Sequence, residues 1–349
     1  MSDVSNPFLI YAYAGPKYFC DRIEETEHLI SALRNGRNVT LMSPRRMGKT
    51  GLIQNVFHQI RRDYPEAVCF YMDIFSTTCL DDFIIQFGQT VIGKLDNLSQ
   101  KTLAAISGFF KSCRLVFSPD VLTGVPQATL DFQPSQAQAT LKEIFDYLEH
   151  SGKECYIAID EFQQITEYPE KGVEGLLRSY IQFLPHVHFI FSGSKQHLMA
   201  EMFTSPARPF YQSVTLMNLK PLDVEKYKEF ATAKFEERNK HLDTAIIKEL
   251  FTRFDGITSY IQRVMNVLFL KTPEQGTCTL DMVDDAINYN LNMASDTYET
   301  LLRQMPEKQR NVFIAISAEG EARSVKSGAF AKKYHLPSPS SVNSALKGL

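Results

Sequence analysis

The sequence predicts an α/β protein in which a parallel sheet is flanked by helices and followed by a helical region. Five apolar runs of strand length alternate with stretches of helical spacing, as in parallel sheets that are covered on both faces. The first run leads directly into a loop with glycine and lysine and then into a helical stretch. From Asp223 onward, apolar residues recur every three or four positions, which is typical of amphipathic helices.

The expected strands share a continuous apolar character and lie at 39–42, 67–72, 155–159, 187–191 and 214–216. Such runs are typical of strands that are buried on both faces. In open parallel sheets, ligands bind beyond the carboxyl ends of the strands. The residues that directly follow each run are therefore the first candidates for a functional site.

The loop after the first strand has the form of a nucleotide-phosphate loop, Ser43-Pro44-Arg45-Arg46-Met47-Gly48-Lys49-Thr50. Its backbone N–H groups, with those of the helix that continues from Gly51, would bind the phosphates. Lys49 would reach the β- and γ-phosphates, and the Thr50 hydroxyl would bind Mg²⁺. Ser43 stands where the consensus begins with glycine. Gly48 is present at the position where a side chain would obstruct the phosphates.

Two acidic residues follow the third predicted strand. Asp160 would hold Mg²⁺ through a water, and Glu161 would polarise the water that attacks the γ-phosphate. The next strand ends in Ser192-Gly193-Ser194. Ser192 or Ser194 would sense the γ-phosphate there, although a turn of small residues after a core strand explains the same pattern.

Composition narrows the class of protein. The chain has 349 residues, 44% hydrophobic and 22% charged, which is typical of a globular protein of two or three domains. A net charge of -3 argues against a protein that coats nucleic acid. The six cysteines lack metal-binding spacing and favour reduced thiols in the cytoplasm. We expect no secretory signal and no membrane partner, because no apolar run is long enough to span a bilayer.

With these elements placed, the chain resembles the archaeal-type P-loop ATPases, which are related to the AAA+ and STAND groups. The resemblance extends over roughly residues 6–349. It rests on these segments: Phe19-x-x-Arg22-x-x-Glu25, the loop 44–50, Asp160-Glu161-Phe162-Gln163, Phe191-Ser192-Gly193-Ser194, and Pro209-Phe210-Tyr211 with Leu219-Lys220-Pro221-Leu222. The family commonly has an arginine soon after that tyrosine. Here Gln212 holds the position, and Arg208 lies just upstream.

The resemblance implies a P-loop ATPase core of the AAA+ type, a helical lid and a winged helix. We expect the core at 1–220, with an unassigned insertion at about 95–136, the lid at 221–296 and the winged helix at 297–349. In the lid, Arg263 would reach the γ-phosphate as a second sensor, or it is simply exposed. The winged helix is expected to be incomplete, since no wing strands follow its third helix. From Leu301 onward the sequence contains eight Lys or Arg residues and only three Glu residues, and this local positive charge favours an acidic partner.

The function predicted is ATP binding and Mg²⁺-dependent ATP hydrolysis, coupled to a change in the lid and winged helix. Candidates for the arginine that stabilises the transition state are Arg45, Arg46, Arg178 and Arg208, in the same chain or from a neighbouring copy. Two alternatives stay open. One is a slow nucleotide-controlled switch with a protein partner or self-association, and the other is a DNA-associated ATPase.

Overall fold

The computed structural model describes residues 4–95, 106–119, 126–320 and 322–349. Its main sheet has five parallel strands in the order β2-β5-β6-β1-β7. These strands are β1 (Val39–Met42), β2 (Val68–Asp73), β5 (Cys155–Asp160), β6 (Val187–Gly193) and β7 (Thr215–Asn218). The predicted α/β sheet is confirmed, and all its strands end at one edge.

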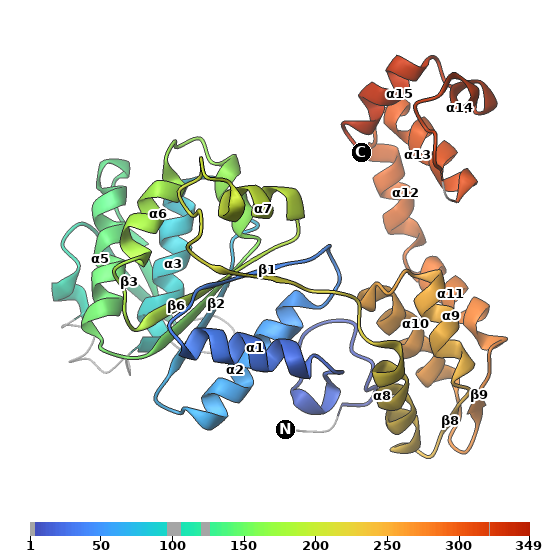
Figure 1. Ribbon diagram of the computed structural model, residues 1–349, viewed down its shortest axis with the longest axis horizontal. Coiled ribbons are helices and arrows are strands. Elements are labelled where there is room, and N and C mark those ends of the chain that lie inside the picture. The colour runs from blue at the N-terminus through green and yellow to red at the C-terminus, as the bar shows by residue number, and fades with distance from the viewer. Residues whose placement is uncertain (1–3, 96–105, 120–125, 321) are drawn as a thin grey trace. The chain divides into compact units, whose positions relative to one another are not determined.

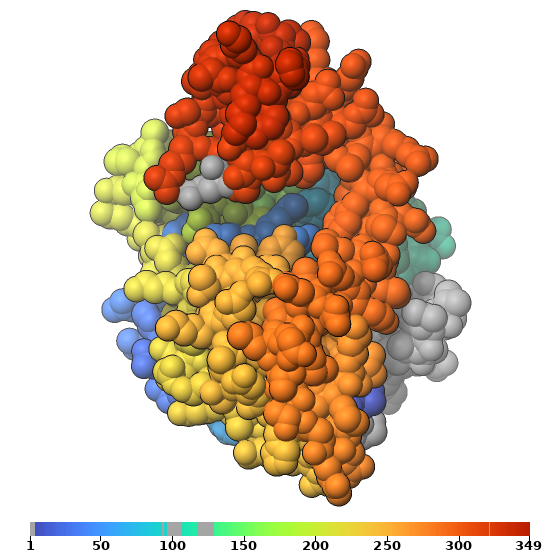
Figure 2. Space-filling model, turned by 90° about the vertical axis from the view of Figure 1, so that its right-hand side faces the viewer, coloured from blue at the N-terminus to red at the C-terminus, as the bar shows by residue number. Residues whose placement is uncertain are grey.

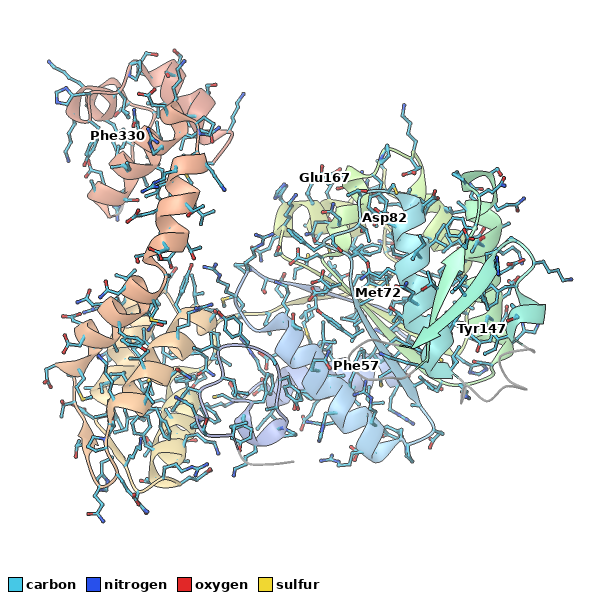
Figure 3. The ribbon with its side chains drawn as sticks, turned by 180° about the vertical axis from the view of Figure 1, so that it is seen from behind. Phe57, Met72, Asp82, Tyr147, Glu167 and Phe330 are labelled. Carbon is cyan, nitrogen blue, oxygen red and sulfur yellow. The ribbon has the colours of Figure 1, made fainter. Side chains whose placement is uncertain are left out.

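Helices cover both faces of this sheet (Figure 1). One face carries α1 (Ile23–Arg34) and α2 (Lys49–Asp63), and the other carries α3 (Leu80–Leu95), α5 (Ala137–His150), α6 (Val173–Ile181) and α7 (Gln196–Thr204). Successive strand side chains enter two separate apolar cores. Figure 3 labels one buried residue from each, Phe57 of α2 and Met72 of β2. Burial on both faces is the reason that the strands read as continuous apolar runs.

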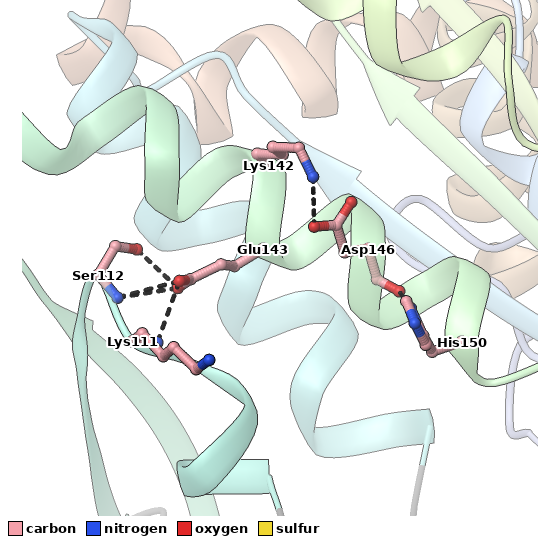
Figure 4. A network of polar contacts seen from close by, with 6 residues as sticks. All are labelled: Lys111, Ser112, Lys142, Glu143, Asp146 and His150. Atoms are coloured by element: carbon pink, nitrogen blue, oxygen red, sulfur yellow. Dashed lines mark hydrogen bonds and ion pairs between the residues drawn. The ribbon is translucent and has the colours of Figure 1, made fainter.

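The unassigned insertion contains an antiparallel hairpin of β3 (Arg114–Pro119) and β4 (Pro126–Asp131). The hairpin packs closely against α3. A Cβ added to Gly88 of α3 would lie only 2.1 Å from Leu130 Cδ1 of β4. Glu143 of α5 accepts hydrogen bonds from the backbone N–H groups of Lys111 and Ser112 and from the Ser112 hydroxyl (Figure 4). The described part of the insertion is thus fixed to the core, while residues 96–105 and 120–125 lie outside the described residues.

Three short 3-10 helices also occur within the described residues, η1 (Pro16–Tyr18), η2 (Pro134–Gln136) and η3 (Phe162–Glu167). The helical region after β7 consists of α8 (Val224–Glu236), α9 (Ala245–Arg253) and α10 (Thr258–Lys271), which confirms the helices predicted there. Its outer surface is gold in Figure 2. The periodicity did not reveal the two-residue strands β8 (His241–Leu242) and β9 (Thr277–Cys278), which pair in parallel.

The N-terminal segment joins this helical region to α2. Phe8 is fully buried among the rings of Phe230, Phe235 and Phe269. The Asn266 side chain donates to Phe8 O at 2.8 Å. Farther along the segment, the Tyr13 hydroxyl donates to Asn55 Oδ1 of α2 at 2.8 Å. The segment between these anchors is therefore held against both α2 and the helical region after β7.

Contacts divide the chain into two units, Met1–Leu280 and Asp281–Leu349. The second unit contains α11 (Met282–Met293), α12 (Ser295–Gln304), α13 (Glu307–Glu319), α14 (Gly328–Lys333) and α15 (Pro339–Leu346), and no strand occurs among its described residues. Its small core is built around Val312, Phe330 and Val342. The division into core, lid and winged helix at 220 and 296 stays a prediction. None of the described helices is long and apolar enough to cross a membrane.

Candidate nucleotide site

The predicted phosphate loop, residues 43–50, connects β1 to the start of α2 and encloses the side chain of Ser43. Ser43 is fully buried, and its hydroxyl donates to Pro44 O at 2.9 Å. The Lys49 ammonium donates to Ser43 O at 3.2 Å and to Ser43 Oγ at 3.4 Å. Serine in place of the consensus glycine is thus accommodated inside the loop and supports the lysine.

Backbone conformation explains the glycine before the lysine. Gly48 has φ 90°, in the left-handed region that glycine adopts without strain. Apart from its chain neighbours, no atom of the described residues would lie within 4 Å of a Cβ at this position, so the backbone is open on this side. No side chain caps α2 among the described residues. The first N–H groups of α2 are therefore available to an anion.

The two groups expected to bind Mg²⁺, the Thr50 hydroxyl and the Asp160 carboxylate, lie side by side in the structure. The Thr50 hydroxyl donates to Asp160 Oδ2 at 2.9 Å. The Tyr71 hydroxyl of β2 donates to the same oxygen at 2.8 Å. The other oxygen, Asp160 Oδ1, accepts from the Glu161 N–H at 3.0 Å. Asp160 is thus held in one orientation, and Tyr71 is a contributor that the sequence reasoning missed.

Glu161 begins the turn after β5 in a left-handed conformation, φ 55°. Its Oε2 accepts from the Ser194 hydroxyl at 2.8 Å and from the Gln163 amide at 2.5 Å. Arg45 Nε donates in turn to Ser194 Oγ at 3.4 Å. A polar chain therefore runs from the phosphate loop to Glu161 through the tip of β6. Non-glycine residues in strained conformations are frequent at functional sites.

Charge is concentrated on the sheet side of the site. Burial lowers the pKa of Lys49, while the nearby carboxylates of Asp160 and Glu161 raise it. Asp73 pairs in register with Asp160. Burial raises the pKa of Asp73, the Phe75 N–H lowers it, and the charges of Asp160 and Glu161 raise it further. The Lys49 ammonium is thus buried close to the carboxylates of Asp160 and Glu161, and Asp73 lies beside Asp160 on the neighbouring strand.

A pocket of about 570 Å³ lies above these groups. From the loop and strand ends it is lined by predicted site residues, namely Arg45, Arg46, Gly48, Lys49, Thr50, Gly51, Asp160 and Glu161. Its opposite walls come from the N-terminal segment, including Leu9, Ile10 and Phe19, and from Thr258, Ser259 and Gln262 of α10. The sequence reasoning did not assign these walls to the site. The cluster of apolar and aromatic residues at 8–13 was the available signal.

Several predicted site residues do not line the pocket. Met47 is buried in the apolar core on the α2 side. Ser192 is fully buried, and its hydroxyl has no hydrogen-bond partner within the described ranges. Arg208 forms an ion pair with Glu174 at 2.5 Å. Arg263 lies over the Tyr11 ring at 5.5 Å. The predicted catalytic or sensing roles of Ser192, Arg208 and Arg263 therefore stay predictions.

Solved structures share this fold at low sequence identity. A Walker-type ATPase of Pyrococcus abyssi is 19% identical with a TM-score of 0.63, over 98% of this chain and 93% of that chain. The Aeropyrum pernix ORC2 protein, in ADPNP–ADP complexes, is 15% identical with a TM-score of 0.62, over 98% and 88% of the two chains. The Aeropyrum pernix ORC1 protein in complex with DNA is 12% identical with a TM-score of 0.58, over 99% and 87%.

Sequence families match both parts of the chain. Residues 296–349 match a probable winged helix domain, which confirms the resemblance noted for the C-terminal region. No curated protein matches the sequence. Residues 19–264 match the family described as an ATPase domain predominantly from Archaea. Since that match covers more than half of the chain, the chain belongs to this ATPase family.

Proposed function

We propose that this chain binds ATP with Mg²⁺ in the pocket at the sheet edge and hydrolyses the ATP. The observation that carries the proposal is the 2.9 Å hydrogen bond from Thr50 to Asp160. It brings together two sequence motifs that lie 110 residues apart. Membership in an ATPase family supports the same reaction.

The two ends of a nucleotide find different surroundings in the pocket. The open backbone around Gly48, the N-terminus of α2 and the Lys49 ammonium suit the phosphates. The apolar wall that includes Leu9, Ile10 and Phe19 suits the base. We infer that the base lies against the N-terminal segment and the phosphates lie in the loop.

Thr50 and Asp160 fit a magnesium ion by the chemistry of their donor atoms. Both offer oxygen, the ligand atom that Mg²⁺ prefers. Bound there, Mg²⁺ would neutralise charge on the phosphates. The Tyr71 hydroxyl fixes the Asp160 carboxylate. The expected contribution of the protein is therefore an oriented pair of oxygen donors.

For hydrolysis, Glu161 would accept a proton from water as that water attacks the γ-phosphate. The bond to the β-phosphate oxygen then breaks, leaving ADP and inorganic phosphate. Ser194 and Gln163 both bond Oε2 of Glu161, so these contacts set the direction of Oε1. Arg45 lines the pocket and is the arginine that we propose for the γ-phosphate within one chain. Arg178 and Arg208 would act on the pocket of a neighbouring copy.

Steady-state ATP hydrolysis with Mg²⁺ tests the proposal in the full chain. Glu161→Gln should lower turnover by about 10²–10⁴-fold while ATP still binds, because proton transfer alone is lost. Lys49→Ala should abolish both turnover and binding. Glu167→Gln and Lys171→Ala, at exposed positions, are the matched controls. Wild-type protein that binds no ATP would refute the proposal, and binding without turnover would favour the nucleotide-controlled switch.

A DNA-associated ATPase is the second candidate function. Ser340 and Ser344 of α15 and Lys347, which directly follows the helix, are exposed, while Val342 and Ala345 are buried. A polar helix face with surplus positive charge nearby suits a phosphate backbone. Duplex DNA should then stimulate hydrolysis, with binding that weakens steeply as salt rises. Equal turnover with and without DNA, and no binding at low salt, would remove this candidate.

A further inference from the structure

One residue of the phosphate loop is attached to the lid by both its backbone and its side chain. Arg46 O accepts a hydrogen bond from the Ser259 N–H at 3.1 Å. The Arg46 guanidinium donates to the Tyr260 hydroxyl and lies 5.0 Å from the centre of the Tyr260 ring. Ser259 and Tyr260 belong to the first turn of α10. No other residue of the loop 43–50 has a hydrogen bond to α10 among the contacts described.

The surroundings fix both partners. Arg46 has φ 70°, a conformation that costs free energy for a non-glycine residue. The next residue, Met47, is buried in the same apolar cluster against which Ile257 packs. The Tyr260 ring lies 5.9 Å from the ring of Phe254, at the end of α9. Arg46 and Tyr260 are therefore held in place from opposite sides of the junction.

Arg46, Ser259 and Gln262 also line the nucleotide pocket, whereas Arg263 does not. A guanidinium has five N–H donors, so it can bond the Tyr260 hydroxyl and a phosphate oxygen together. We propose that Arg46 and Tyr260 form a loop–lid link through which phosphates in the loop order the first turns of α10. Tyr260 acts as a positioning residue, through Arg46. This inference rests on the proposed nucleotide site and names the residue that connects it to the lid.

Reciprocity makes the link measurable from both ends. If bound phosphates order α10 through Arg46, then an intact contact to α10 must tighten nucleotide binding by the same factor. Removing the Tyr260 hydroxyl leaves its ring in contact with Arg46 and Phe254. We expect Tyr260→Phe to weaken binding of a non-hydrolysable ATP analogue with Mg²⁺ by about 5–10-fold.

The experiment combines a double-mutant cycle with amide hydrogen exchange. Analogue affinity is measured for wild type, Tyr260→Phe, Arg46→Gln and the double variant, with Tyr298→Phe on α12 as the hydroxyl-removal control. In wild type the analogue should slow exchange across 258–271, and Tyr260→Phe should remove most of that slowing. In the Arg46→Gln background, Tyr260→Phe should have no further effect on affinity.

Two results would overturn the link. One is an unchanged affinity and unchanged protection of α10 in Tyr260→Phe. The other is an equal loss of affinity from Tyr260→Phe with and without Arg46, which would show that the hydroxyl acts independently of the arginine. In both cases the proposed function stands if the wild-type chain binds the analogue and Lys49→Ala abolishes that binding. A wild-type chain that binds no analogue would overturn the proposed function and the link together.

Discussion

Gly193, at the end of β6, sits where the core and the candidate catalytic residues meet. A Cβ added there would lie 2.3 Å from Gln163 Oε1 and 2.6 Å from Met199 Cγ and Sδ. Real Cβ atoms do not make contacts this short. Both neighbours are buried side chains, so neither can turn freely out of the way. Gly193→Ala should therefore displace Gln163 from Glu161.

The stability loss expected for Gly193→Ala follows from overpacking of a dense interior, about 1–3 kcal/mol. For a unit of this size each kcal/mol lowers Tm by about 2–4 °C, so the shift should be about 2–12 °C. Since Gln163 also bonds Glu161, ATP turnover should fall in protein that is still folded. ATP binding should change little, because the phosphate loop is not displaced.

Thermal unfolding and steady-state hydrolysis below Tm are the two assays. Gly175→Ala is the matched control, because a Cβ at this position of α6 would meet its first neighbour, Pro209 Cγ, only at 3.9 Å. Alanine in a helix interior should raise stability by about 0.5–1 kcal/mol. A Gly193→Ala variant with wild-type Tm and wild-type turnover would refute the packing and the Gln163–Glu161 contact.

Three further predictions test the site and the second unit. Asp73→Asn should raise Tm at neutral pH, since burial and neighbouring carboxylates raise the Asp73 pKa. A carboxyl group whose pKa is raised by folding destabilises the folded state at pH values above that pKa. The difference in Tm between variant and wild type should therefore vanish as the pH falls toward 3.8. A difference that does not depend on pH would contradict this. Gly51→Ala would place a Cβ 3.1 Å from Phe19 Cε2 and should weaken ATP binding about tenfold through the base wall, which is about 1.4 kcal/mol. Inorganic triphosphate should bind nearly as before, and equal losses for both ligands would argue against a base at Phe19. Ser338→Ala removes the side-chain cap of α15 and should destabilise the second unit by about 1 kcal/mol, as followed by hydrogen exchange in α15, with ATP binding unchanged.

Local pattern was sufficient for much of this protein. Short consecutive stretches of sequence were enough to identify the apolar strands, the loop with Gly48 and Lys49, and the acidic pair after β5. The sheet edge then brings Thr50 to Asp160, because parallel strands end on the same side. The helices of the lid were predictable for the same reason, since their apolar spacing is local.

Contacts between distant segments were decided only by the tertiary structure. Tyr71, Gln163 and Tyr260 reach the site through hydrogen bonds whose geometry depends on strand order and on the lid. The packing of the N-terminal segment against the pocket and of the β3–β4 hairpin against α3 likewise cannot be predicted from sequence periodicity. The contacts of Arg208 with Glu174 and of Arg263 with the Tyr11 ring are also visible only in the tertiary structure, and the roles predicted for these arginines stay predictions. Periodicity and motif spacing reveal which residues share a strand or a helix, whereas partners across the fold depend on how those elements pack.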